Sequence, residues 1–316
     1  MENHYFTCEE VRPGVYAAIV KEGMGALGNA GFVNLGEATL VFDTFALPQA
    51  AAELRATAES LTGNPVKYAV NSHFHGDHTN GNQLFRDSVI ISTPKTREKM
   101  AETFAEMSRA ERKSALILSL QKTEEQLAKT ESDQLRRSLE IQRSDQRRLW
   151  EAIDLLEQTL PTLLIEDKLV LECSRRRVEL HHFGCGHTCS DLLMYVPEEK
   201  ILFAGDLVLA DHHAWMGHGR PEEWLTILDR LAPFEIDTVI PGHGPAGKRE
   251  QIDKMKTYLN DMMSVVSDNK RKGLTADEIL CRPIPLKHAH LNSAHMYERN
   301  VRFLYDYVEQ GLISQA

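Results

Sequence analysis

The eight residues 71–78 read Asn-Ser-His-Phe-His-Gly-Asp-His, and they place three imidazoles and one carboxylate within six positions. Imidazole nitrogens and carboxylate oxygens are common ligands of Zn²⁺ in proteins. A hydrogen-bonding role could account for a single histidine here, but it does not account for the whole H-x-H-x-D-H pattern. The segment therefore predicts a metal site.

The chain around these residues indicates two ions rather than one. Val66–Val70 is an apolar run typical of a buried strand, and the extended backbone after it points His73 and His75 in the same direction. Asp77 and His78 are consecutive, and the chain turns away from the first pair there. We expect His73 and His75 to bind one ion and Asp77 and His78 to bind its neighbour.

Two ions need more ligands than this segment offers, and three later positions can supply them. His187, Asp206 and His243 each follow a glycine at or near the end of an apolar stretch. Glycine allows the sharp turn and the close approach of backbone that a ligand loop requires. These three residues are candidates to complete both ions.

In this order, the motifs resemble those of the metallo-β-lactamase-fold hydrolase superfamily, over about residues 14–247 with one insertion. The segments Asn71-Ser-His and Asn80-Gly-Asn-Gln-Leu-Phe are similar to a large bacterial subgroup of zinc-dependent hydrolases within it. The resemblance implies a first ion bound by His73, His75 and His187, a second ion bound by Asp77, His78 and His243, and Asp206 as the bridge between them.

Two further residues are expected to support the ligands without binding metal. Asp43, after Leu-Val-Phe, matches an early aspartate of that family. A carboxylate at such a position orients a ligand imidazole through its other ring nitrogen. Thr188, which follows the ligand His187, is expected to have a similar supporting role.

A weak internal repeat favours a four-layer αββα sandwich of the α/β class. Residues 36–43 and 197–206 each combine a polar turn, an apolar strand and a closing Asp. Each is followed by a stretch with helical character, at 48–61 and 221–231, and then by a strand that ends in a ligand histidine. Two such halves would pack sheet on sheet, with the metals at the shared edge.

The length of 316 residues, of which 42% are hydrophobic, is ample for one large domain spanning 1–316. Residues 97–160 contain neither Gly nor Pro and carry apolar stripes at both ends, so they predict a helical insertion shaped as a hairpin or arm. It could be a spacer, a lid over the metals or the contact of a homodimer. Residues 253–316 are expected to form a C-terminal helical extension.

The formal net charge of −10 argues against a nucleic-acid partner, because phosphate binding needs clustered cations. Arg175–Arg177 is the only dense basic run. It lies between two strand-like stretches, 168–172 and 178–182, so we expect a solvated hairpin turn there.

Five cysteines are an odd number, so free thiols are expected. Cys185 and Cys189 flank His187 closely, but His or Asp already fills every metal position, so neither is expected to bind zinc. Residues 1–10 lack the basic start and apolar core of a signal peptide, and no stretch reaches membrane-spanning length. We expect a cytoplasmic enzyme without a membrane contact.

The ligand set suits two Zn²⁺ ions, with Mn or Fe as other possible metals. A water bridging them would lose a proton near neutral pH and act as the nucleophile, with Asp77 orienting it and passing the proton. Redox relatives of this fold carry an acidic iron ligand where His75 stands, so hydrolysis is favoured over oxygen reduction. True β-lactamases commonly place Cys or Ser where Asp206 stands, which argues against that activity.

The sequence predicts a hydrolase of a small-molecule ester, lactone, thioester or amide. A phosphodiesterase or nuclease of the same fold is the alternative, and a metal-bearing scaffold is the third. His212, His213 and Trp215 are candidates for substrate contact, and His218 lies in the same loop. A later histidine cluster is expected at the surface or at a subunit contact: His288, His290 and His295.

Overall fold

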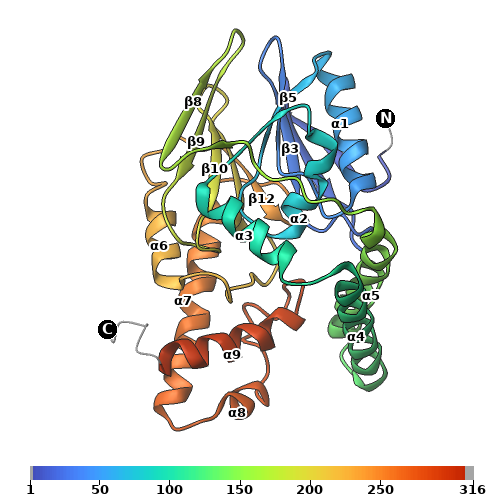
Figure 1. Cartoon of the computed structure of the whole chain (residues 1–316). Helices are drawn as coiled ribbons and strands as arrows, with labels where there is room; N and C mark the ends of the chain where they lie inside the picture. Colours follow the sequence, from blue (N-terminus) through green and yellow to red (C-terminus); the bar gives the residue numbers. More distant parts are fainter. Residues whose placement is uncertain (1–2, 310–316) are drawn as a thin grey trace.

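The structure, a computed structural model, describes residues 3–309, and it contains two β-sheets packed face to face (Figure 1). Neighbours in the first sheet follow chain order from β1 to β7. Its strands are β1 (Phe6–Arg12), β2 (Val15–Val20), β3 (Ala30–Asn34), β4 (Thr39–Phe42), β5 (Val66–Val70), β6 (Val89–Ser92) and β7 (Leu163–Leu164). The first four strands pair antiparallel, and β4 to β7 pair parallel.

The second sheet has the order β12-β11-β10-β9-β8. Its strands are β8 (Lys168–Glu172), β9 (Arg177–His182), β10 (Leu192–Val196), β11 (Ile201–Leu209) and β12 (Thr238–His243). All of its pairs are antiparallel except β11 with β12.

Three apolar clusters join four layers. One lies between the sheets and includes Phe42, Met194 and Phe203. A second packs α1 (Pro48–Thr62) on the outer face of the first sheet, and a third packs α6 (Pro221–Asp229) and α7 (Glu250–Arg271) on the outer face of the second. The predicted αββα fold is confirmed.

The sheets approach each other closely at Gly31. A Cβ at this position would lie 2.4 Å from the Phe203 ring and 2.6 Å from the Tyr16 carbonyl oxygen. Only glycine therefore allows β3 and β11 to pack at this separation.

The predicted repeat corresponds to two β-α-β units with parallel strands. In one unit β4 and β5 flank α1, and in the other β11 and β12 flank α6. The carboxyl ends of parallel strands lie at one edge of a sheet, where ligands commonly bind. This arrangement places the predicted site residues at the same edge of the sandwich: Asp43, the segment 71–78, Asp206 and His243.

Three helices occupy the predicted insertion: α3 (Pro94–Ala105), α4 (Arg109–Lys129) and α5 (Asp133–Ala152). The last two lie side by side as a hairpin (Figure 1), which ends in the short 3-10 helix η2 (Ile153–Leu155). The predicted start at 97 lies inside α3. Because Thr93 and Thr96, at the first turn of α3, bond to Ser190, we now propose that the appended element begins at Arg109.

The predicted C-terminal extension contains α7, α8 (Ala276–Leu280) and α9 (His295–Glu309), and its residues 310–316 lie outside the described part of the chain. The helix α7 begins at Glu250 and buries Met255, Leu259 and Met262 against the second sheet. It is thus one of the four layers and not an appendage. Among residues 3–309, no helix is both long enough and apolar enough to cross a bilayer.

The expectation of a solvated basic turn between β8 and β9 is wrong for one of its three arginines. Arg176 is only 6% exposed. Its guanidinium donates to the carbonyl oxygens of Pro13, Gly14 and Asn34, and it pairs with Glu199 at 2.8 Å. It therefore joins the β1–β2 turn to the second sheet.

Replacing Arg176 should destabilise the protein strongly, because Glu199 and three carbonyl groups would lose their shared donor. We expect Arg176→Ala to lower the free energy of unfolding by about 3 to 5 kcal/mol, the usual effect of breaking a buried ion pair. Arg175→Ala, at the exposed neighbour, should change it by less than about 0.5 kcal/mol. Urea unfolding of both variants checks this, and equal stabilities would contradict the role of Arg176.

Candidate metal centre

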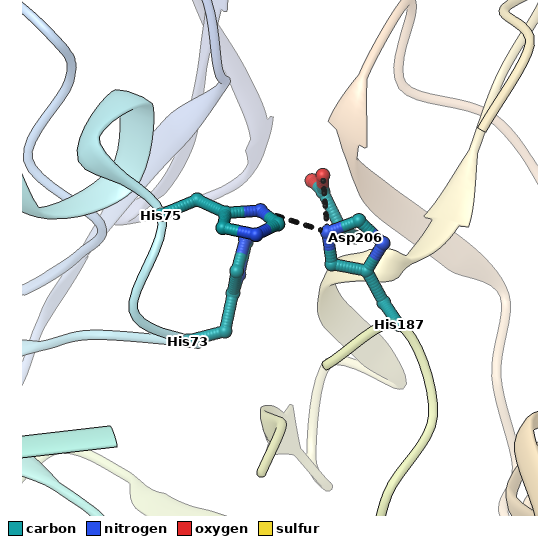
Figure 2. Close-up of side chains that lie close together, drawn as sticks. All are labelled: His73, His75, His187 and Asp206. Atoms are coloured by element: carbon teal, nitrogen blue, oxygen red, sulfur yellow. Dashed lines mark hydrogen bonds and ion pairs between the residues drawn. The ribbon is translucent and has the colours of Figure 1, made fainter. Parts of the chain in front are cut away.

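Four predicted ligands meet between the two sheets. Single ligand atoms of His73, His75, His187 and Asp206 all lie within 4.8 Å of one another. Figure 2 shows the histidines of the first sheet facing His187 and Asp206 of the second. His187 Nε2 lies 3.0 Å from His75 Nδ1 and 3.3 Å from Asp206 Oδ2. This group has the number and types of ligand that one ion needs.

A second group lies beside the first and consists of Asp77, His78 and His243, again within 4.8 Å of one another. Asp206 contacts this group as well, because Oδ1 lies 3.2 Å from His78 Nε2 and Oδ2 lies 3.3 Å from His243 Nε2. One carboxylate therefore contacts both groups, as expected for a residue that bridges two ions.

Local structure explains how the chain presents these ligands. His73 and His75 precede the single turn of α2 (Gly76–Thr79), and that turn carries Asp77 and His78. The 3-10 helix η1 (Asn80–Phe85) continues the chain away from the site. At the other side, a Cβ on Gly242 would lie 1.9 Å from Asp206 Oδ1, so only glycine fits next to the bridging carboxylate.

The structure places Asp43 directly behind His78. Asp43 Oδ2 lies 2.9 Å from His78 Nδ1, which turns Nε2 of that ring toward the ligand group. Asp43 also accepts hydrogen bonds from the Ser72 amide and hydroxyl, and Ser72 Oγ lies 2.9 Å from His73 Nδ1. One buried carboxylate therefore orients two ligand imidazoles.

Thr188 also lies behind a ligand, but it acts through an aspartate that sequence reasoning missed. Asp191 accepts hydrogen bonds from the amides of Gly186 and Thr188 and from the Thr188 hydroxyl. These bonds fix the loop that carries His187. Burial raises the pKa of Asp191 to about 7, against the lowering effect of these donors. A possible signal was its position four residues after a ligand and directly before an apolar strand.

Burial keeps one set of histidines neutral. It lowers the pKa of His75 to about 3 and of His187 to about 4, and it lowers that of His73 well below its usual value. Neutral imidazole is the form that binds metal. Nε2 of His73 is buried without a hydrogen-bond partner among the described residues, as a nitrogen reserved for an ion would be.

The largely buried carboxylates Asp77 and Asp206 favour positive charge on the groups around them. Burial would lower the pKa of His243, but Asp206 and Asp77 raise it to about 10. The same carboxylates, with Asp43, raise the pKa of His78 well above its usual value despite its burial. In the absence of metal, protons on His78 and His243 neutralise the charge of Asp77 and Asp206. Divalent ions bound to the same residues would supply that positive charge instead, so the residues present fit divalent ions.

Two cysteines and part of the loop after Asp206 lie away from the ligands. Cys185 Sγ contacts the Cys189 carbonyl oxygen, and neither thiol belongs to a metal group in residues 3–309. His213 is 2% exposed and lies 3.1 Å from the Tyr258 hydroxyl, so we withdraw it as a substrate residue. His212 faces the site, with its ring 6.1 Å from that of His243.

A cavity of about 740 Å³ opens onto the second ligand group, since Asp77, His212 and His243 line it. The helix α5 forms one wall, and the segment 290–299 forms another. His290 and His295, which the sequence assigned to the surface or a subunit contact, therefore lie in this wall, whereas His288 is buried against Asp261.

Comparisons with known proteins agree with this geometry. A family model described as the metallo-beta-lactamase superfamily matches residues 24–243. The chain belongs to this superfamily. Its His and Asp clusters can bind a metal, and the relatives described next are named as hydrolytic enzymes.

The relatives differ in activity. The chain is 21% identical over 255 residues to a linear primary-alkylsulfatase from Pseudomonas sp., a match that covers 77% of this chain and 47% of that protein. It is 26% identical over 106 residues to a type 2 metallo-beta-lactamase from Bacteroides fragilis, covering 32% and 43% of the two chains. It is 28% identical over 103 residues to the human acyl-coenzyme A thioesterase MBLAC2, covering 30% and 36%. Each match thus spans at most about half of the relative.

Solved structures share the fold. A metallo-beta-lactamase from Pontibacter korlensis superposes with a TM-score of 0.58 at 17% identity, covering 81% of this chain and 99% of that one. The enzyme TMB-1 gives a TM-score of 0.57 at 17% identity, covering 82% and 98%. At such identities the likeness concerns the fold alone.

The shared carboxylate predicts how metal binding responds to single changes. Asp206→Ala should weaken both ions, whereas His187→Ala should mainly weaken the first. We expect two zinc ions per wild-type chain by elemental analysis, about one tightly bound ion for His187→Ala and fewer than one for Asp206→Ala. A wild-type content of one ion after zinc is resupplied would contradict a dinuclear centre.

Asp145, a residue of the cavity wall, should make the stability of the protein depend on pH. Burial raises the pKa of Asp145 to about 6, although it accepts a hydrogen bond from the Gly25 amide. The folded protein therefore holds this proton to higher pH than the unfolded chain, and the free energy of unfolding falls as pH rises from about 4 to about 6. Asp145→Asn removes this penalty and keeps an acceptor oxygen for Gly25.

We expect Asp145→Asn to match the wild type at pH 4 and to exceed it by up to about 3 kcal/mol at pH 8, since one unit of pKa corresponds to about 1.36 kcal/mol. Urea unfolding in chelator at both pH values measures this. Glu151→Gln, at an exposed position of the same helix, should show no such difference. A gain that is equal at both pH values would refute the assignment to Asp145.

Proposed function

We propose that the protein is a zinc-dependent hydrolase with two Zn²⁺ ions, acting on a small-molecule ester, lactone, thioester or amide. The observation that carries the proposal is the pair of ligand groups joined by Asp206 at the floor of a cavity. His73, His75 and His187 would hold one ion, and Asp77, His78 and His243 the other. Other divalent metals such as Mn or Fe remain alternatives for the same ligands.

Two divalent ions bound there would polarise the scissile carbonyl and lower the pKa of a shared water, so that hydroxide forms near neutral pH. The chain's own residues set up this chemistry. Asp43, Ser72 and Asp191 fix the ligand rings or loops. Asp77 lines the cavity, and His78 and His243 hold its pKa well below the usual value although burial alone would raise it. It is thus an ionised group that can orient a reactant by accepting a hydrogen bond from it.

The cavity supports a small-molecule substrate, because about 740 Å³ lies in the range of ligand pockets. The relatives include an alkylsulfatase and a thioesterase, and both names denote enzymes that cleave an ester-type bond. Neither name fixes the substrate of this chain. Sulfate esters therefore join the carbonyl compounds as candidates to be tested.

A phosphodiesterase of the same fold is less well supported. Nucleic-acid substrates need several cations along the site. Of the three Lys and Arg side chains in the cavity wall, Arg137 pairs with Glu22 and Lys21 donates to the Asn3 carbonyl oxygen, which leaves Arg299 alone for an anion. The helical hairpin is of mixed charge and does not form a basic arm.

A substrate panel tests the proposal. Zinc-loaded protein should hydrolyse at least one chromogenic ester, lactone, thioester or amide, and hydrolysis should stop when a chelator removes the metal. A sulfate ester and bis(p-nitrophenyl) phosphate are the comparison substrates. Turnover of the phosphodiester alone would favour the alternative, and no turnover of any compound would contradict hydrolysis of these classes.

Replacing Asp77 should separate catalysis from folding. Asp77→Asn keeps the shape of the side chain but removes the charge that binds the second ion and accepts a proton. We expect kcat/KM to fall at least ~100-fold, the usual effect of losing positioned acid–base help. Cys189→Ala should leave turnover unchanged, since we assign no nucleophilic role to that thiol. An acyl adduct on any Ser or Cys, detected by mass spectrometry of quenched protein, would overturn direct attack by water.

A further inference from the structure

The wall of the cavity is largely apolar away from the ligands. Leu27 lies on it next to Gly28, which touches the His78 ring. Leu149 and Ile141 lie on it two helical turns apart on α5, and Met296 lies on it from α9. None of these side chains is needed to hold the ligands. Their shared property is a surface that fits an aliphatic chain.

Arg299 is the cation of this wall that pairs with neither a carboxylate nor a carbonyl oxygen among the described residues. Arg299 projects from α9 into the wall and lies over the Trp215 ring, with its guanidinium carbon 5.2 Å from the ring centre. Within residues 3–309 no carboxylate pairs with it, unlike Arg137, which pairs with Glu22, and Arg302, which pairs with Asp277 and Glu298. An arginine fixed by an aromatic ring and left without an anion is a ready anion site.

Two aromatic rings connect Arg299 to the metal centre. The Trp215 ring beneath it is 5.8 Å from the ring of His218, and His218 Nδ1 lies 2.7 Å from Nε2 of the ligand His75. A charged group bound by Arg299 would therefore lie on the side of the Trp215 and His218 rings, which lead to His75.

No carboxylate of the cavity wall forms an ion pair with Arg299 among the described residues. Glu22 is paired with Arg137, and Asp145 accepts from the Gly25 amide. Asp133, at the first turn of α5, also lines the cavity but forms no ion pair with Arg299.

We propose that the cavity binds an amphipathic anion, whose aliphatic part lies against Leu27, Ile141, Leu149 and Met296 and whose negative group pairs with Arg299. This rests on the proposed function for the reaction, but the binding step is separate from it. It deepens that function by naming the substrate class: an aliphatic ester or thioester that carries one negative charge.

Binding of non-hydrolysable probes tests the proposal without turnover. Octane-1-sulfonate and octan-1-ol share one chain and differ in charge, and calorimetry on zinc-loaded protein measures their Kd. We expect the sulfonate to bind more tightly than the alcohol. Arg299→Ala should weaken the sulfonate roughly tenfold and leave the alcohol unchanged, as expected for one charged hydrogen-bonding partner. Arg302→Ala, on the same helix but already paired, should change neither.

Two further variants complete the test. Arg299→Lys should retain part of the sulfonate affinity, and Ile141→Ser should weaken both probes. Repeating the titrations on metal-free protein separates Arg299 from direct binding of the sulfonate to zinc. Equal affinities of the two probes, or a wild-type Kd in Arg299→Ala, would overturn the proposal. Selective binding in a protein that hydrolyses no compound of the panel would leave this inference standing and refute the proposed function.

A different observation supports a second inference, about His218. The loop 211–220 is fixed at several points: buried Asn300 donates to the Ala214 carbonyl oxygen and accepts from the Met216 amide, and the Arg220 amide donates to the Gly186 carbonyl oxygen. The loop thereby presents His218 to the outer nitrogen of His75. His75 is the ligand whose other nitrogen, Nδ1, faces His187.

We infer that His218 is a positioning residue that orients His75 for the first ion. With Nδ1 of His75 turned toward the ligand group, its Nε2–H donates to Nδ1 of His218. This assigns to His218 for the first ion the role that Asp43 has for the second.

Metal affinity and cobalt spectroscopy test this role. We expect His218→Ala to weaken the first ion about 10- to 100-fold in chelator competition and to change the visible spectrum of the cobalt-substituted protein. His218→Asn, whose side-chain oxygen can accept from His75, should restore much of the affinity. His290→Ala, which alters the cavity wall alone, should leave both unchanged. A wild-type affinity and spectrum in His218→Ala would overturn the inference.

Discussion

The structure depends on the cost of burying three carboxylates around His78. Asp43 and Asp206 are almost fully buried, and Asp77 is largely so. Charges removed from water destabilise a protein unless opposite charges and hydrogen bonds compensate. Asp43 is compensated by Ser72 and the His78 ring, but Asp77 and Asp206 share only imidazoles. The site is therefore built for cations, and the raised pKa of His243 shows the same demand being met by a proton.

This constraint explains why the fold repeats one unit. Each β-α-β unit ends its parallel strands at the same edge, so ligands far apart in sequence converge without strain in the helices that cover the sandwich. The helical hairpin and α9 add the cavity wall above this edge. The ligand groups and the cavity wall thus come from different parts of the chain, and the wall can vary without altering the ligands.

The fold could be predicted from sequence because the ligands are recognised by residue type and by glycine placement, and the strands by apolar runs. Contacts between segments that are distant in the sequence could not be predicted. Arg176 was assigned to water because its neighbours are basic and lie at a turn, yet it reaches two carbonyl groups of the β1–β2 turn and a third at the end of β3. His213 lies in the same loop as His212 but points into the interior. The hydropathy of the loop does not show which of the two side chains is buried. The pairing of His218 with His75 spans 143 positions and leaves no local pattern.

The central claim is that Asp206 binds two ions at once. Anomalous diffraction from crystals of zinc-loaded protein, recorded on both sides of the zinc absorption edge, tests it most directly. The account predicts two zinc peaks, one among His73, His75 and His187 and one among Asp77, His78 and His243, with a carboxylate oxygen of Asp206 bound to each. A single peak at full zinc occupancy, or two peaks of which only one contacts Asp206, would contradict it.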